Sequence, residues 1–181
     1  MSRVVLAMLI CAAVTGVGSA AVPDPDTVLA RREIQKRYES LREAYLLNEG
    51  PDAVIALRTA DYTAHMASGE VWDLEKASAY TRAAFQQVVK TLDVSFTIES
   101  IELRGDKAAV RIAQHWKRLQ NKAGAVRTVE TYAKQRETWQ RTDEGWKLFM
   151  VDDVVPGAWY VDGKRIDPSK PYDPKAPEFK P

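Results

Sequence analysis

The 181-residue sequence is poor in cysteine and histidine, with a single cysteine, Cys11, and two histidines, His65 and His115. Cys11 lies within the first 21 residues, so a chain cleaved after Ala20 or Ala21 contains no thiol. This excludes disulfides, thiolate nucleophiles and thiolate metal sites from the mature chain. The histidines are 50 positions apart and in no His-x-x-x-His spacing. We therefore expect neither a metal nor a cofactor.

The sequence also lacks an excess of charge of either sign and the common phosphate-binding motifs. Without Arg3, the 25 basic residues balance the 25 acidic residues. A neutral chain attracts nucleic acids and anionic bilayers weakly, so we expect neither as the main partner. There is no Gly-rich phosphate loop, no Gly-x-Ser-x-Gly motif and no Asn-x-Ser/Thr acceptor. Specificity for a small molecule inside a cavity fits this composition better than recognition of a charged surface.

Residues 1–21 differ from the rest of the chain and resemble a targeting segment. Arg3 is their only charge, an apolar run extends from Val4 to Val14, and the segment ends in Gly18-Ser19-Ala20-Ala21. A basic start, an apolar centre and a small-residue end are typical of a secretory signal peptide. The 11-residue run is too short to cross a bilayer, which takes ~20 residues. We expect a secreted or periplasmic protein without a membrane anchor after cleavage.

The remaining sequence is interpreted as one domain over residues 22–155 and a Pro-rich extension over residues 156–181. Capping signals and apolar spacing predict three helices, over residues 26–47, 52–58 and 73–92. Period-two patterns then predict four strands, over residues 94–103, 107–119, 126–141 and 146–154, with a bulge near Glu99 and Ser100. Their short connections require antiparallel neighbours. The extension predicts a small hairpin around Asp162-Gly163.

Helices followed by an antiparallel meander form an α+β plan. Several local motifs resemble the nuclear-transport-factor-2-like superfamily, and within it the SnoaL-like and calcium/calmodulin-kinase-association-like branch. They are Ala44-Tyr45 to Gly50, Asp61 with Gly69, Gly105 to Val110, and Trp139 with Asp143 to Leu148. The resemblance covers about residues 26–154. It implies a cone-shaped domain, commonly a homodimer, in which three N-terminal helices pack on a curved antiparallel sheet around a pocket.

Two carboxylates are the first candidates for chemistry. Strand alternation places Trp139 and Trp146 on one face of the last hairpin, and we interpret this as the inner face because both rings need burial. Glu137 and Asp152 share that face with Gln135, Leu148 and Met150. Two carboxylates in one apolar pocket can differ in pKa, which suits acid–base catalysis. The alternative is that Glu137 pairs with a cation and Asp152 lies in water.

The two histidines are the other candidate bases, because imidazole titrates near neutral pH. His65 lies in the irregular segment before the third helix. His115 lies on the second long strand, and the parity of that strand leaves it facing either the pocket or the outside. For both histidines, an ordinary polar side chain is the alternative.

Aromatic side chains predict an apolar pocket with a few polar groups, the usual composition of small-molecule sites. The expected ligand-binding residues are Tyr38, Tyr45, Trp72, Trp116, Gln135, Trp139 and Met150. Ordinary core packing is the alternative for each ring. The sequence favours an exported domain that binds a small, partly apolar molecule. The alternatives are an acid–base isomerase or hydrolase acting on a small molecule, with Glu137, Asp152 and a histidine, and a homodimeric interaction module.

Overall fold

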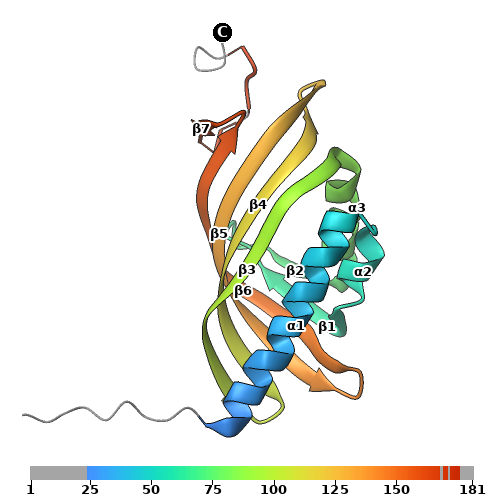
Figure 1. Ribbon diagram of the computed structural model, residues 1–181, viewed down its shortest axis with the longest axis vertical. Coiled ribbons are helices and arrows are strands. Elements are labelled where there is room, and N and C mark those ends of the chain that lie inside the picture. The colour runs from blue at the N-terminus through green and yellow to red at the C-terminus, as the bar shows by residue number, and fades with distance from the viewer. Residues whose placement is uncertain (1–23, 168, 171, 176–181) are drawn as a thin grey trace, which may run out of the picture.

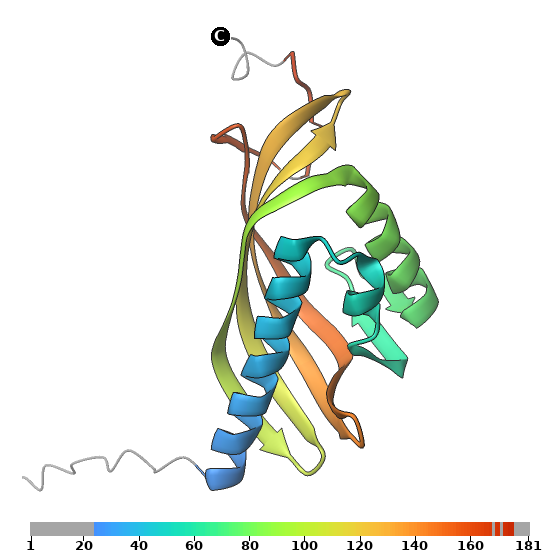
Figure 2. The same cartoon turned by 45° about the vertical axis from the view of Figure 1, so that its right-hand side comes forward.

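The computed structural model describes residues 24–167, 169–170 and 172–175, so the signal peptide expected over residues 1–21 lies outside it. The protein is α+β, and its helices lie on one side of a long curved sheet (Figures 1 and 2). In chain order the elements are α1 (Pro25–Leu47), α2 (Pro51–Ile55), β1 (Arg58–His65), β2 (Val71–Asp73), α3 (Leu74–Gln87), β3 (Val88–Arg104), β4 (Lys107–Lys122), β5 (Ala125–Thr142), β6 (Gly145–Val161) and β7 (Lys164–Ile166).

The sheet is mixed and unclosed. Its strand order is β2-β1-β6-β5-β4-β3, and β7 pairs with the far end of β6. Strands β3 to β6 form the predicted antiparallel meander, but β1 pairs with β6 in parallel, so the expectation of a purely antiparallel sheet is wrong. The reason is topological: the chain passes from β1 through β2 and α3 to the opposite edge of the sheet before β3 begins. The segment 61–72, predicted as irregular or short strand, thereby contributes two short strands at an edge of the sheet.

Two aspartates start the long helices. The Asp24 side chain accepts a hydrogen bond from the Thr27 backbone N–H at 3.1 Å, and the Asp73 side chain accepts one from Lys76 at 2.8 Å. Such caps satisfy backbone donors that have no partner within a helix. The third helix ends earlier than predicted, at Gln87. The following Val-Val pair opens β3 instead, because β-branched side chains favour the extended backbone and this segment pairs with β4.

The meander strands are long and locally irregular. The β3–β4 register shifts between Ile98 and Ser100, where the change of alternation predicted a bulge. The predicted hairpin also forms: β6 and β7 pair across Asp162 and Gly163, which have φ angles of 50° and 78°. Glycine is suited to such a turn because it lacks a Cβ. Strand β6 runs to Val161, so the expected boundary at residue 155 falls within it.

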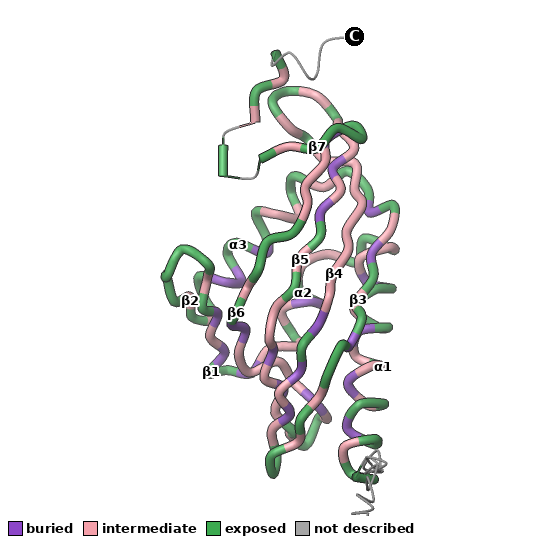
Figure 3. The backbone as a smooth tube through the Cα atoms, turned by 90° about the vertical axis from the view of Figure 1, so that its left-hand side faces the viewer, coloured by how far each residue is buried: buried purple, intermediate pink, exposed green. Residues whose placement is uncertain are grey.

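The core lies between the helices and the concave face of the sheet. One cluster packs α1 side chains such as Ile34 and Tyr38 against Val110, Trp139 and Trp146 of the sheet. A second cluster joins β1, α3 and β6. Figure 3 looks onto the opposite face of the sheet, in front of which none of the described helices lies. Among the described residues, no helix is both long enough and apolar enough to cross a membrane.

Candidate functional site

A cavity of about 340 Å³ lies between the two core clusters, under the helices and against the concave face of the sheet. Its volume is at the lower end of the range for small-molecule sites. Residues of α1, α2, β1, α3 and the meander strands all contribute to its wall. Six of the residues predicted to bind a ligand line it: Tyr38, Tyr45, Trp72, Trp116, Gln135 and Trp139.

An aromatic wall forms one side of the cavity. Tyr45 stacks on Phe85, with ring centroids 5.3 Å apart, and meets Trp116 edge-on at 4.5 Å. Phe96 continues the wall, 5.4 Å from Trp116 and 5.5 Å from Tyr38. Tyr38 and Tyr45 reach the same cavity because seven residues make about two helical turns. Flat rings arranged in this way offer a large apolar contact surface to a bound molecule.

Glu137 is a buried carboxylate in the cavity wall, 4% exposed. It accepts hydrogen bonds from the Tyr38 hydroxyl, from Trp139 Nε1 at 2.8 Å and from Gln135 Nε2 at 2.6 Å. No cationic nitrogen of the described residues forms an ion pair with it. Burial raises the pKa of Glu137, and the three hydrogen bonds oppose that rise. The site therefore holds a buried carboxyl group whose pKa lies above its ordinary value.

Two guanidinium groups, Arg58 and Arg118, also line the cavity. Arg58 Nη2 donates to the Thr81 hydroxyl at 2.8 Å, and its Cζ lies 4.9 Å from the centroid of the Tyr62 ring. The Cζ of Arg118 lies 5.1 Å from the centroid of the Trp116 ring. Arg58 Nη1 and Arg118 Nε are buried and have no hydrogen-bond partner in the described part of the chain. Two arginine nitrogens beside the cavity thus have unused hydrogen-bond donors.

Strand parity fails for Asp152 and Met150, which do not line the cavity although both were expected on the inner face. The β5–β6 register shifts between Thr138, opposite Met150, and Trp139, opposite Leu148. This one-residue bulge turns the following β6 side chains to the other face, so that Val151 lines the cavity instead. Asp152 accepts two hydrogen bonds from Arg136, each 2.7 Å long.

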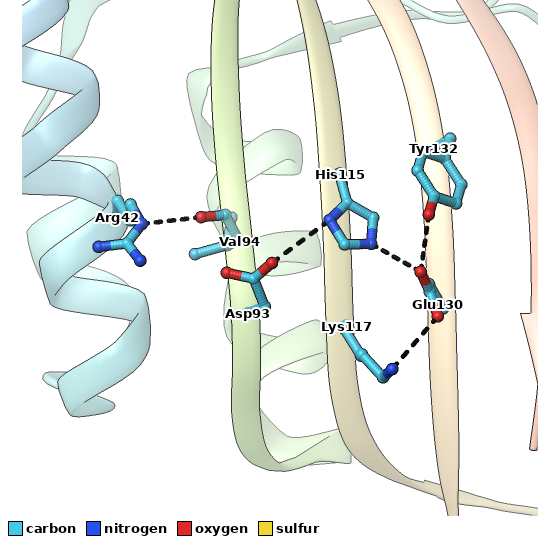
Figure 4. Close-up of polar contacts among 7 residues, drawn as sticks. All are labelled: Arg42, Asp93, Val94, His115, Lys117, Glu130 and Tyr132. Atoms are coloured by element: carbon cyan, nitrogen blue, oxygen red, sulfur yellow. Dashed lines mark hydrogen bonds and ion pairs between the residues drawn. The ribbon is translucent and has the colours of Figure 1, made fainter.

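The histidines also lie away from the cavity. Figure 4 shows His115 between Asp93 and Glu130, bridging three strands. Its Nε2 lies 2.9 Å from a Glu130 oxygen and its Nδ1 lies 3.5 Å from an Asp93 oxygen. His65 is exposed near the end of β1. In the described residues, no group of three His, Cys, Asp or Glu side chains is placed to hold a metal ion.

The sequence analysis missed both cavity arginines and Tyr62. A signal for Arg118 was present, because it continues the alternation Gln114, Trp116 on the same strand, and all three line the cavity. Arg58 was interpreted as the end of the second helix. It starts β1 instead, and this strand, unlike the meander, had no clear period-two pattern.

No protein-family model matches the sequence, and no curated protein matches it. Solved structures do resemble it. One is a protein from Novosphingobium aromaticivorans that bears the name "putative scytalone dehydratase". Its TM-score is 0.63 at 16% sequence identity, and the match covers 75% of this chain and 89% of that one. A second is a nuclear-transport-factor-2-like superfamily protein from Salmonella enterica, with a TM-score of 0.57 at 12% sequence identity. The match covers 73% of this chain and 94% of that one. A third is a hexachlorocyclohexane dehydrochlorinase (LinA), with a TM-score of 0.60 at 12% sequence identity. The match covers 83% of this chain and 97% of that one. The chain has the nuclear-transport-factor-2-like fold, as the sequence motifs predicted.

Proposed function

We propose that this chain, on its nuclear-transport-factor-2-like fold, is an exported protein that binds a small, partly apolar molecule in the cavity. The observation that carries the proposal is the composition of the cavity wall, which combines stacked aromatic rings with a few buried polar groups. A cavity of about 340 Å³ has room for a molecule of two or three rings.

Binding can be tested with N-phenyl-1-naphthylamine, a neutral dye that fluoresces in apolar surroundings. Ala84 on α3 lines the cavity, whereas its neighbour Ala83 is exposed. Ala84→Trp should fill part of the cavity and weaken dye binding about tenfold or more, and the matched Ala83→Trp variant should bind as the wild type does. No saturable dye binding by the wild type, or equal loss in both variants, would contradict the proposal.

Acid–base catalysis is a second candidate, favoured by the buried Glu137 carboxyl beside the Tyr38 hydroxyl. Two of the similar structures bear the names of a dehydratase and a dehydrochlorinase, so the fold is compatible with an elimination reaction. The probe is 5-nitrobenzisoxazole, whose ring opens when a base removes one proton. A rate above that of buffer, lost in Glu137→Gln, supports catalysis, and equal rates in both proteins exclude it for this probe.

Export and self-association are parts of the same proposal. Export is supported by the composition of residues 1–21, and intact-mass analysis of protein from culture medium or periplasm should show a chain that begins after Ala20 or Ala21.

Homodimer formation is supported by exposed apolar side chains on the meander strands, among them Tyr132 and Val155. Analytical ultracentrifugation should then give twice the mass of one chain, and a monomer at all concentrations would contradict it.

A further inference from the structure

The two cavity arginines are cations without counter-ions. Neither Arg58 nor Arg118 forms an ion pair with a carboxylate in the described residues. Each also buries a nitrogen without a hydrogen-bond partner, Nη1 of Arg58 and Nε of Arg118. Both arginines are half-buried, and an unpaired buried donor costs free energy. The Tyr62 and Trp116 rings contact the two guanidinium groups but carry no negative charge.

The two guanidinium groups share the cavity wall with Tyr45, and both affect its electrostatics. Both lower the pKa of Tyr45, although burial dominates and raises it to about 12. Tyr45 therefore remains protonated at neutral pH and keeps its hydroxyl proton as a donor. Thr81 holds Arg58 by a hydrogen bond of 2.8 Å, and the hydroxyl of Thr81 is itself fixed by donating to the Ala77 carbonyl at 2.8 Å. This end of the cavity is rich in donors that are held in place.

The acidic group of the cavity belongs to a separate network. Glu137 is occupied by Tyr38, Gln135 and Trp139, and it does not neutralise either arginine. Burial shifts the pKa of Glu137 upward. The positive charge of the two arginines is therefore available to a ligand.

We infer that the molecule bound in this cavity carries an oxyanion, which Arg58 and Arg118 bind while the aromatic wall contacts its apolar body. This inference rests on the proposed binding function and specifies the ligand class. Guanidinium groups recognise carboxylates, sulfonates and phosphates because their N–H donors match the spacing of the oxygens. The oxyanion accepts hydrogen bonds from the guanidinium groups in the cavity wall.

The test compares two dyes with the same aromatic body. N-phenyl-1-naphthylamine is neutral, and 8-anilino-1-naphthalenesulfonate is the same molecule with a sulfonate. The wild type should bind the sulfonate at least about tenfold more tightly, since a charge-assisted hydrogen bond contributes that much or more. Tight neutral binding without this preference would overturn the inference and leave the proposed function intact. Binding of neither dye would overturn both.

Matched variants assign the preference to the arginines. Arg58→Met and Arg118→Met should each weaken sulfonate binding more than neutral-dye binding, and so lose most of the sulfonate preference. Arg111→Met, on the same strand as Arg118 but outside the cavity, should change neither affinity. Ala84→Trp should weaken both dyes, which separates cavity binding from adsorption to the surface. An unchanged preference in both arginine variants would overturn the inference.

Two further measurements keep the inference testable if a variant folds poorly. The melting temperature of ligand-free Arg118→Met should equal or exceed that of the wild type, because the substitution removes a half-buried charge that has no ion-pair partner in the described residues. A large decrease would show that the arginine serves the fold instead. On the wild type, 2-naphthoate and 2-naphthyl phosphate should both displace the neutral dye better than 2-naphthylmethanol does, and their order distinguishes a carboxylate site from a phosphate site. Equal competition by the alcohol would overturn the inference.

Discussion

Glu137→Gln tests the buried carboxyl group most sharply, because the amide has nearly the shape of the acid but does not titrate. Glu137 is 4% exposed and accepts hydrogen bonds from Tyr38, Gln135 and Trp139. A glutamine can keep its oxygen toward Tyr38 and Trp139. Its NH₂ then faces Gln135, whose own amide can turn to present its oxygen. We expect the substitution to cost about 1 kcal/mol or less in hydrogen bonding.

The pH dependence carries the main signal. Burial raises the folded-state pKa of Glu137 above that of an unfolded glutamate, which is about 4.3. Below that pH both states are protonated and the full stability is present. As the pH rises toward the folded pKa, the unfolded chain releases a proton that the folded protein retains, so wild-type stability falls by about 1.4 kcal/mol per pH unit. Glu137→Gln removes this loss, and the variant gains relative to the wild type as the pH rises.

Urea unfolding between pH 4 and 8 measures the difference in free energy of unfolding between variant and wild type. Glu49→Gln, at an exposed position after α1, is the matched control and should give a flat difference. A flat profile for Glu137→Gln, or one in which the variant loses stability as the pH rises, would refute the argument. It would mean that the three hydrogen bonds outweigh burial.

Three further predictions concern the fold around the cavity. Asp73→Ala should lower the free energy of unfolding by about 1 kcal/mol, because it removes the cap of α3, and unchanged urea unfolding would contradict the cap. Gly157→Ala should cost about 1–3 kcal/mol, since its Cβ would lie 2.8 Å from the Tyr132 carbonyl oxygen, and a neutral effect would contradict this close approach of β5 and β6. His115→Gln should leave dye affinity within about twofold, because His115 lies outside the cavity, and a tenfold loss would contradict that placement.

Local signals predicted the elements that local chemistry determines. The Asp24 and Asp73 caps, the bulge after Ile98 and the turn at Asp162-Gly163 all follow from short-range sequence patterns. The parallel pairing of β1 with β6 could not be predicted this way, because it joins residues about 90 positions apart. Long-range pairing depends on how the whole chain packs, and β1 lacks a clear alternation.

The candidate site was predictable only in part, for a reason visible in one strand. Alternation along β5 placed Gln135, Glu137 and Trp139 together, and all three line the cavity. The same rule failed on β6 because a single-residue bulge reverses the facing of Met150 and Asp152. A bulge of that kind depends on cross-strand register and leaves little trace in the sequence itself.

A crystal structure of the protein with 8-anilino-1-naphthalenesulfonate tests the central claim most directly. We predict the naphthalene ring against Tyr45 and Trp116, with sulfonate oxygens within hydrogen-bond distance of the Arg58 and Arg118 guanidinium groups. A dye found only on the outer face of the sheet, or an empty cavity in crystals grown at a saturating concentration, would contradict it.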